Sequence, residues 1–152
     1  MPHSLNEFAD QLNEIMPVVA REFWKKQGSD LDKNKITISQ LFILNLLAKR
    51  GESKMGDLAH FMEVTTAAMT GIVDRLVRSG YAVRLPQTED RRIIKIGLSS
   101  RGEQLIKRVN LDKRQMVIKI FGKISQGERE EYLKILMHIH DTLSKEKQEA
   151  AR

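Results

Sequence analysis

The chain has 152 residues, 41% of them hydrophobic, and its 26 Lys and Arg exceed its 20 Asp and Glu, which leaves a net charge of +6. This length is sufficient for one domain with a substantial core, and the basic excess favours a polyanionic partner. Cysteine is absent, which excludes disulfides and thiolate metal sites, and without a signal peptide pattern or an apolar run of about 20 residues we expect a cytoplasmic protein with no membrane partner.

The N-terminal segment carries one helical stripe of apolar residues. From Ser4 to about Gln27 these residues recur every three or four positions, which predicts one long helix. Pro17 lies inside this helix and removes a backbone donor, so we expect a kink there and not a break. Residues 28–35, GSDLDKNK, are polar and turn-like, and they are predicted to link this helix to the next one.

Two further helices are predicted between residues 37 and 62. Thr37 is a suitable N-cap for a helix over residues 38–49. This helix is apolar around most of its circumference, so it is expected to be the buried centre of the lobe. A short helix over residues 54–62 follows, with Ser53 as its expected cap.

The stretch from Thr65 to Gly80 has the clearest helix signals. Its apolar residues recur at i, i+3, i+4, i+7 and i+8, so they form one packing face. Thr65 is placed to cap the first turn, and Gly80 is placed to end the helix in a left-handed conformation. The packing face consists of Met69, Ile72, Val73, Leu76 and Val77.

The opposite face of this helix has only small or hydroxyl side chains in its first turns. Such a helix can enter the DNA major groove deeply, where hydroxyls reach base edges and methyl groups meet thymine. The alternative is an ordinary amphipathic helix with a solvated polar face. The short connection to the preceding helix predicts a helix-turn-helix. The candidate base-reading residues are Thr65, Thr66, Ala67 and Thr70, and the candidate phosphate contacts are Arg75 and Arg78.

The hydrophobic period changes after Gly80. Residues 81–85 and 92–98 are rich in β-branched side chains and predict two strands, and the PQTED sequence between them is typical of a turn. A two-stranded hairpin needs cover to be stable, and beside a helix-turn-helix it becomes the wing of a winged helix. The candidate DNA contacts of this wing are Arg84, Arg91, Arg92 and Lys95.

Two helices are predicted after the wing. One runs from Ser99 to about Gly122, and the other begins at a capping box formed by Ser125 and Glu128 and continues to about Lys147. Their apolar stripes, like that of the first helix, exceed what one small lobe can bury. The economical solution is a homodimer with interleaved terminal helices, and the alternative is helical packing within one chain.

The expected fold is therefore mainly α with a small β-hairpin wing, in a single domain over residues 1–152. Residues 36–102 are expected to form the winged helix-turn-helix lobe, and they contain 10 Lys and Arg against 6 Asp and Glu. Residues 1–30 and 103–152 are expected to form a helical dimerisation region.

Several motifs together resemble the MarR family of winged-helix transcription regulators over nearly the whole chain. The most specific is D-R-R followed after five residues by L-[ST]-x-x-G, which here is Asp90-Arg91-Arg92 and Leu98-Ser99-Ser100-Arg101-Gly102. The family usually has threonine at the position of Ser99, and serine keeps a hydroxyl cap. The other matches are Thr37-x-x-Gln40, Leu58-Ala59, Met69-Thr70, Val73-Asp74-Arg75-Leu76, Gly80-Tyr81 and Arg84.

The resemblance implies a homodimer that acts as a transcription repressor on a pseudo-palindromic operator in double-stranded DNA. Its fourth helices would enter successive major grooves, and its wings would reach the adjacent minor grooves. Arg92 is implied to enter the minor groove while Asp90 holds it, with Arg91 close by, and the negative potential of a narrow minor groove agrees with this role. The alternative for both arginines is an exposed charged turn.

The resemblance also implies release from DNA by a small, often aromatic and anionic effector that binds between the DNA lobes and the dimer region. Phe23 and Trp24 are the candidate lining residues, and the alternative is that both belong to the core. No catalytic set or cofactor is predicted. His138 and His140 are not expected to bind one metal ion together, because they point to nearly opposite sides of a helix. The alternative function is a winged-helix protein-interaction module, whose binding would lack the steep salt dependence of phosphate contacts.

Overall fold

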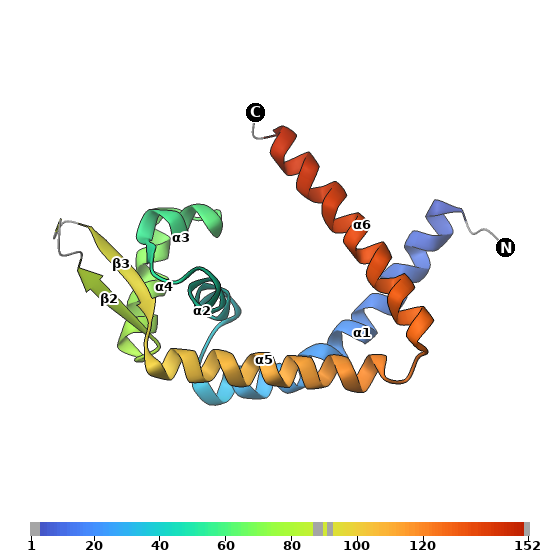
Figure 1. Cartoon of the computed structure of the whole chain (residues 1–152), viewed down its shortest axis with the longest axis horizontal. Coiled ribbons are helices and arrows are strands. Elements are labelled where there is room, and N and C mark those ends of the chain that lie inside the picture. Colours follow the sequence, from blue (N-terminus) through green and yellow to red (C-terminus); the bar gives the residue numbers. More distant parts are fainter. Residues whose placement is uncertain (1–3, 87–89, 91–92, 151–152) are drawn as a thin grey trace. The chain divides into compact units, whose positions relative to one another are not determined.

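The computed structural model describes residues 4–86, 90 and 93–150, and the side chains of these residues except 24–34. The chain divides into two compact units, residues 1–113 and 114–152. The architecture is mainly helical with one small antiparallel sheet, which confirms the predicted fold class (Figure 1). In chain order the elements are α1 (Leu5–Asn34), α2 (Ile38–Arg50), β1 (Ser53–Lys54), α3 (Met55–Phe61), α4 (Thr66–Arg78), β2 (Ala82–Pro86), β3 (Ile94–Leu98), α5 (Ser100–Phe121) and α6 (Gln126–Ala150).

Helix α1 is longer than its sequence pattern predicted. It is unbroken at Pro17, as expected, but it continues through Gly28 to Asn34, so the prediction of a turn-like connection over residues 28–35 is wrong. One glycine costs a helix only about 1 kcal/mol relative to alanine, which is not enough to end it. The helix ends at Asn34, and the residue that follows, Lys35, has a φ of +52° in the left-handed region.

Helix α2 begins with the predicted cap. The Thr37 amide donates to Gln40 Oε1 at 2.9 Å, and the Gln40 amide donates to Thr37 Oγ1 at 3.3 Å, so the two residues form a capping box. The helix buries its main apolar stripe, as expected of a core helix. Ile38 and Phe42, however, remain 52% and 55% exposed, so its burial is one-sided.

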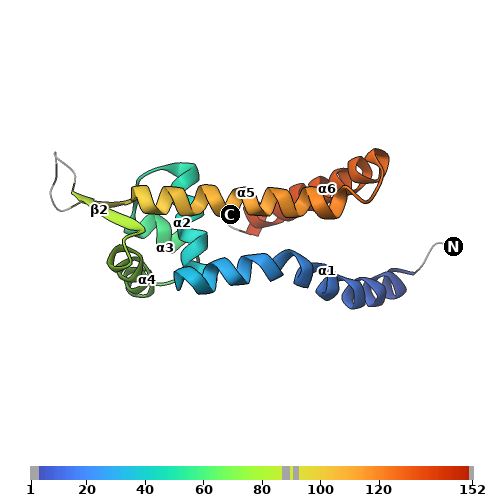
Figure 2. The ribbon, with the colours of Figure 1, turned by 90° about the horizontal axis from the view of Figure 1, so that it is seen from below.

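The core of the first unit lies between α2, α3, α4, the sheet and the first turns of α5. Figure 2 shows α2, α3 and α4 gathered beside β2 and the start of α5. The α5 side chains that complete this core come after residue 102, which was the predicted end of the winged helix-turn-helix lobe. The most deeply buried residues are Ile43, Leu44, Leu58, Met69, Val73, Leu76, Tyr81, Ile96 and Val109. Leu105 and Ile106 are also buried and are only slightly more exposed.

The sheet has three strands in the order β1-β3-β2, whereas the sequence predicted a two-stranded hairpin. Strand β1 has only two residues and pairs antiparallel with β3, with Ser53 opposite Ile96. Ser53 is therefore not the cap of α3, as was predicted; Lys54 occupies that position and makes no side-chain cap hydrogen bond. A two-residue strand is too short to show a hydrophobic period, so only its pairing reveals it.

The second unit contains the end of α5 and the whole of α6. The predicted capping box is confirmed: the Ser125 amide donates to Glu128 Oε2 at 2.8 Å, and the Glu128 amide donates to Ser125 Oγ at 3.3 Å. The Arg129 guanidinium donates to the Phe121 carbonyl at 3.1 Å and so closes the turn. None of the described residues of α6 is buried in a single copy of the chain. Within the described ranges, no helix has the length and apolar character required to cross a bilayer.

Candidate nucleic-acid interface

Helices α3 and α4 are joined by a tight turn. The Val64 amide donates to the Ala59 carbonyl at 3.0 Å, and Glu63 turns the chain with a φ of +53°. Thr65 then caps α4, because its Oγ1 accepts from the Ala68 amide at 3.2 Å. The predicted helix-turn-helix is therefore present, with the predicted cap on its second helix.

The first turns of α4 present a surface without large side chains. Thr66, Ala67 and Ala68 are exposed, and a Cβ atom added to Gly71 would meet no other atom within 4 Å. A mid-helix glycine costs stability, and here no intramolecular contact requires it. The surface is therefore open to the close approach of another molecule. Ala68 also belongs to this surface, although it was not among the predicted site residues.

Two of the three candidate threonines, Thr65 and Thr70, already use their hydroxyl groups in hydrogen bonds within the helix. Thr70 is half-buried, and its hydroxyl donates to the Thr66 carbonyl at 2.8 Å, so toward a ligand it can act only as an acceptor. Thr65 uses its oxygen as an acceptor for the Ala68 amide, so its hydroxyl hydrogen remains available. Thr65 can therefore still donate to a ligand whereas Thr70 cannot, a distinction that the sequence did not predict.

The arginines near α4 fall into two groups. Arg75 and Arg78 are exposed in the last turns of the helix, and within the described residues neither has an ion-pair partner. Arg84 of β2, by contrast, forms an ion pair with Asp74 of α4, with the two side chains 40% and 41% exposed. The pair links the wing to the helix and neutralises a carboxylate on the α4 surface. A phosphate contact by Arg84 stays a prediction.

The tip of the wing lies mostly outside the described residues, and this includes Arg91 and Arg92. Asp90 is exposed, and its carbonyl accepts from the Ile93 amide at 3.0 Å. Lys95 is half-buried on β3, opposite Leu85. The predicted cooperation of Asp90 with Arg92 therefore stays a prediction.

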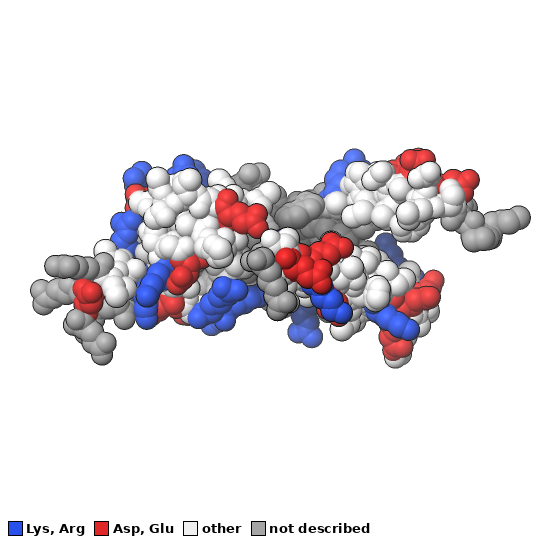
Figure 3. Space-filling view, turned by 90° about the horizontal axis from the view of Figure 1, so that it is seen from above, with Lys and Arg blue, Asp and Glu red and all other residues white. Residues whose placement is uncertain are grey.

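Charges of both signs are interspersed on the face drawn in Figure 3, where Lys and Arg do not form one continuous patch. A broad basic surface is thus not a feature of this face. Affinity for a polyanion through this face would depend on individual arginines and lysines.

The L-S-x-x-G motif has a structural role at the junction of α4, β2 and α5. Ser99 Oγ accepts from the Gly102 amide at 3.0 Å, which confirms the predicted hydroxyl cap, and it also donates to the Gly80 carbonyl at 2.6 Å. A Cβ atom on Gly102 would lie 2.1 Å from the Tyr81 carbonyl oxygen, a distance that no side chain can adopt. Glycine at this position therefore lets α5 begin directly against the first residues of the wing.

Arg101 completes the same junction. Its guanidinium lies over the Tyr81 ring, 4.5 Å from the ring centroid, and it donates to the Ser79 carbonyl at 3.1 Å. It thereby fixes the end of α4 relative to the start of α5. Arg101 stands inside the motif, but nothing in the sequence alone indicated this contact.

The candidate effector residues are only partly described. Phe23 is half-buried, and the Trp24 side chain lies outside the described residues. Their role in binding an effector stays a prediction.

Known proteins resemble this chain in sequence and in fold. The model of the MarR family matches residues 36–94. The HTH-type transcriptional regulator FarR of Neisseria gonorrhoeae is 32% identical over 117 residues, which cover 75% of this chain and 80% of FarR. The HTH-type transcriptional repressor MdtR of Bacillus subtilis is 27% identical over 124 residues, which cover 79% of this chain and 80% of MdtR.

Among solved structures, the complex of S. aureus MepR with DNA matches with a TM-score of 0.72 and covers 86% of this chain and 98% of the MepR chain. At 20% identity this match shows a common fold. The family model and the extent of the similarity to FarR together show that this chain belongs to the MarR family of helix-turn-helix transcription regulators.

Proposed function

We propose that the chain is a homodimeric repressor that binds a pseudo-palindromic DNA operator, with α4 in the major groove and the wing at the minor groove. The observation that carries the proposal is the outer face of α4. Its first turns are exposed and lack large side chains, and the exposed Arg75 and Arg78 follow them. Base edges and phosphates are the partners that suit such a surface. The repressor named MdtR and the DNA complex of MepR agree with this proposal.

The dimer is supported by apolar surface that a single copy leaves open. Leu5, Phe8 and Ile15 of α1 are more than half exposed, and so are Leu133 and Met137 of α6. Exposed apolar side chains on this scale favour a protein partner, and a second copy of the same chain is the commonest such partner. Two copies would also present two α4 helices to one duplex.

A selection from randomised duplexes tests the proposed operator. We expect the full chain to enrich an inverted repeat with half-sites about 10–10.5 base pairs apart, since a dimer reads two successive major grooves. The enriched duplex should lose affinity steeply as salt is added, because phosphate contacts release counterions. Enrichment of no sequence, or of a single unrepeated half-site, would contradict the proposal.

Arg92→Ala tests the predicted role of the wing tip. We expect it to weaken operator binding at least tenfold, or by about 1.4 kcal/mol, while the dimer stays folded, because the guanidinium would no longer enter the minor groove. Arg108→Ala is the matched control, since Arg108 is an exposed arginine on α5. Both variants are titrated with the selected duplex at one salt concentration, and unchanged affinity for Arg92→Ala would reject the role.

Effector control is proposed on the family resemblance. An aromatic anion that lowers operator affinity in wild type, but not in a variant with Phe23 and Trp24 replaced by alanine, would support it. If the variant no longer responds to the anion but binds the operator as tightly as wild type, the two residues belong to an effector site. If the variant also loses operator affinity, they belong to the core.

A further inference from the structure

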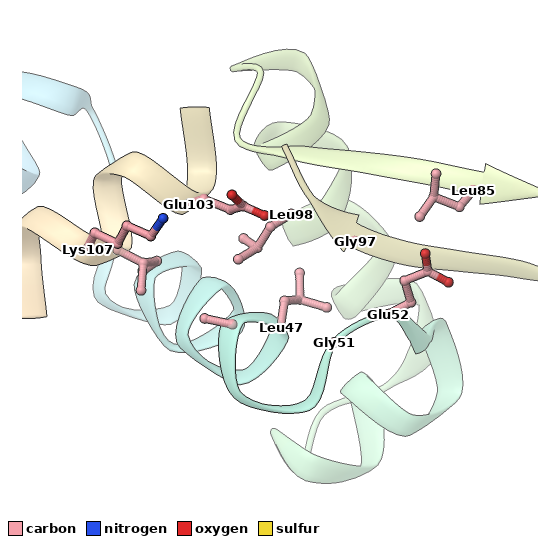
Figure 4. A pocket seen from close by; sticks show the side chains of 10 residues that line it. Leu47, Gly51, Glu52, Leu85, Gly97, Leu98, Glu103 and Lys107 are labelled. Carbon is pink, nitrogen blue, oxygen red and sulfur yellow. The ribbon is translucent and has the colours of Figure 1, made fainter. Parts of the chain in front are cut away.

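A cavity of about 490 Å³ lies at the base of the wing, within the first unit. Its walls come from the end of α2 and the connection that follows, from β2 and β3, and from the first turns of α5 (Figure 4). Leu47, Leu98 and Ile106 supply apolar surface. This wing-base cavity does not include Phe23, so it differs from the effector site predicted above.

Three charged side chains line the cavity, and two of them are carboxylates. Glu52 approaches from the connection that precedes β1, whereas Glu103 and Lys107 stand on α5 (Figure 4). Within the described residues, neither carboxylate has a hydrogen-bond or ion-pair partner. The lining therefore carries a formal excess of one negative charge, although the chain as a whole has a net charge of +6.

We propose that the wing-base cavity binds a small amphiphilic amine, with its ammonium group beside a lining carboxylate and its apolar body against the leucines. The volume lies within the range of about 300–1,000 Å³ that is usual for small-molecule sites. An ammonium group has three N–H donors and a charge opposite to that of either carboxylate. An anion would meet two like charges against one opposite charge, that of Lys107, so the net charge of the lining favours a cation.

The cavity connects the ligand to the wing. Leu85 faces the cavity from β2, and its neighbour Arg84, whose side chain leaves the opposite face of the strand, pairs with Asp74 of α4. Gly97 of β3 also lines the cavity. A bound amine therefore contacts both strands of the wing, and its occupancy changes the position of the wing and the affinity for DNA. This last step depends on the proposed DNA-binding function, whereas the binding of the amine does not.

The binding experiment uses the full chain and three probes of one shape: 4-phenylbutylamine, the neutral 4-phenylbutan-1-ol and the anionic 4-phenylbutanoate. Titration calorimetry without DNA is expected to give the amine the highest affinity, at least about fivefold above the alcohol. Non-specific binding to a basic chain would instead favour the anion. Equal or tighter binding of 4-phenylbutanoate would overturn the proposal.

Isosteric variants locate the site. Glu52→Gln and Glu103→Gln are each expected to weaken amine binding about two- to fivefold, and the double variant about tenfold, because each removes one negative charge that attracts the ammonium group. Glu146→Gln, an exposed glutamate of α6, is the matched control and should bind as wild type does. Both carboxylates are exposed, so the variants should fold. Unchanged affinity in the double variant would refute the site.

A second arm tests the link to DNA. Saturating 4-phenylbutylamine should change the affinity of the wild-type chain for its selected duplex, and it should not change that of the double variant. Amine binding without any change in DNA affinity would overturn the regulatory part. A chain that binds its duplex but no amine would overturn the cavity proposal alone, and a chain that binds the amine but no duplex would overturn the proposed function alone.

Discussion

Gly102 shows how one missing side chain allows two elements to meet. In the Gly102→Ala variant the new Cβ atom would lie 2.1 Å from the Tyr81 carbonyl oxygen, so α5 or the start of the wing must shift. We expect the free energy of unfolding to fall by about 1–3 kcal/mol, the usual cost of overpacking. Urea unfolding measures the loss. Gly127→Ala is the control, because a Cβ atom there meets nothing within 4 Å, and equal stability of the two variants would contradict the assignment.

Gly71 illustrates the opposite case, in which a glycine costs stability without an internal reason. In Gly71→Gln the new side chain points into open space, so the helix should gain about 0.5 kcal/mol from the better propensity of glutamine. The same side chain would obstruct the approach of α4 to a major groove, and we expect at least a tenfold loss of operator affinity, or about 1.4 kcal/mol.

Fluorescence anisotropy with the selected duplex measures the affinity of this variant, and thermal unfolding its stability. Gly127→Gln makes the same change at another open helical glycine and should leave DNA binding intact. If Gly71→Gln bound DNA as tightly as wild type, α4 would not be the inserted helix.

At the scale of elements, the negative charge of Glu128 stabilises the start of α6. Glu128 has its pKa lowered by the hydrogen bond from the Ser125 side chain, then by that from the Ser125 backbone, with a further contribution from Arg129. Since the folded-state pKa lies below the unfolded one, the stabilisation is present above the ordinary glutamate pKa of about 4.3 and is lost as pH falls through the lower folded-state value. The α6 N-terminus should therefore fray in acid.

An NMR titration of the Glu128 carboxyl group tests this assignment. We expect its pKa to rise toward the ordinary value in Ser125→Ala, because the largest cause of the shift is removed. Glu146 in the same spectra serves as the internal reference, since it lies in the last turns of α6 and not at its start. An identical Glu128 pKa in the variant and in wild type would show that the capping box does not hold the charge.

At the scale of the whole molecule, the exposed leucines of the terminal helices decide the assembly. Leu133 and Leu136 are 57% and 42% exposed in a single copy. Burying a leucine fully is worth about 1.5–3 kcal/mol, so replacing both by asparagine should raise the dissociation constant of the dimer at least about a hundredfold. Sedimentation velocity measures the shift toward monomer. Glu131→Gln on the same helix is the control, and a wild type that sediments as a monomer would refute the dimer itself.

Much of the fold could be predicted because its signals are local. A cap joins residues three positions apart, so the Thr37 cap and the capping box of Ser125 with Glu128 could be predicted and are confirmed. The reciprocal bond with Gln40 was not predicted. The bare face of α4 followed from helical period in the same way. The prediction was wrong where the local signal was weak, as at Gly28, where turn-like composition did not prevent the helix from continuing.

The amino-acid sequence by itself determined the helices, the helix-turn-helix and the face that α4 leaves open, because hydrophobic period and capping act within a few residues. Only the tertiary structure decided what distant segments do together: Ser53 paired with Ile96, Gly102 against Tyr81, and Arg84 held by Asp74. The wing-base cavity belongs to the same class, since its lining combines residues from the end of α2, from β2 and β3 and from the first turns of α5. Contacts of this kind depend on how the chain closes its loops, and no short stretch of residues encodes them.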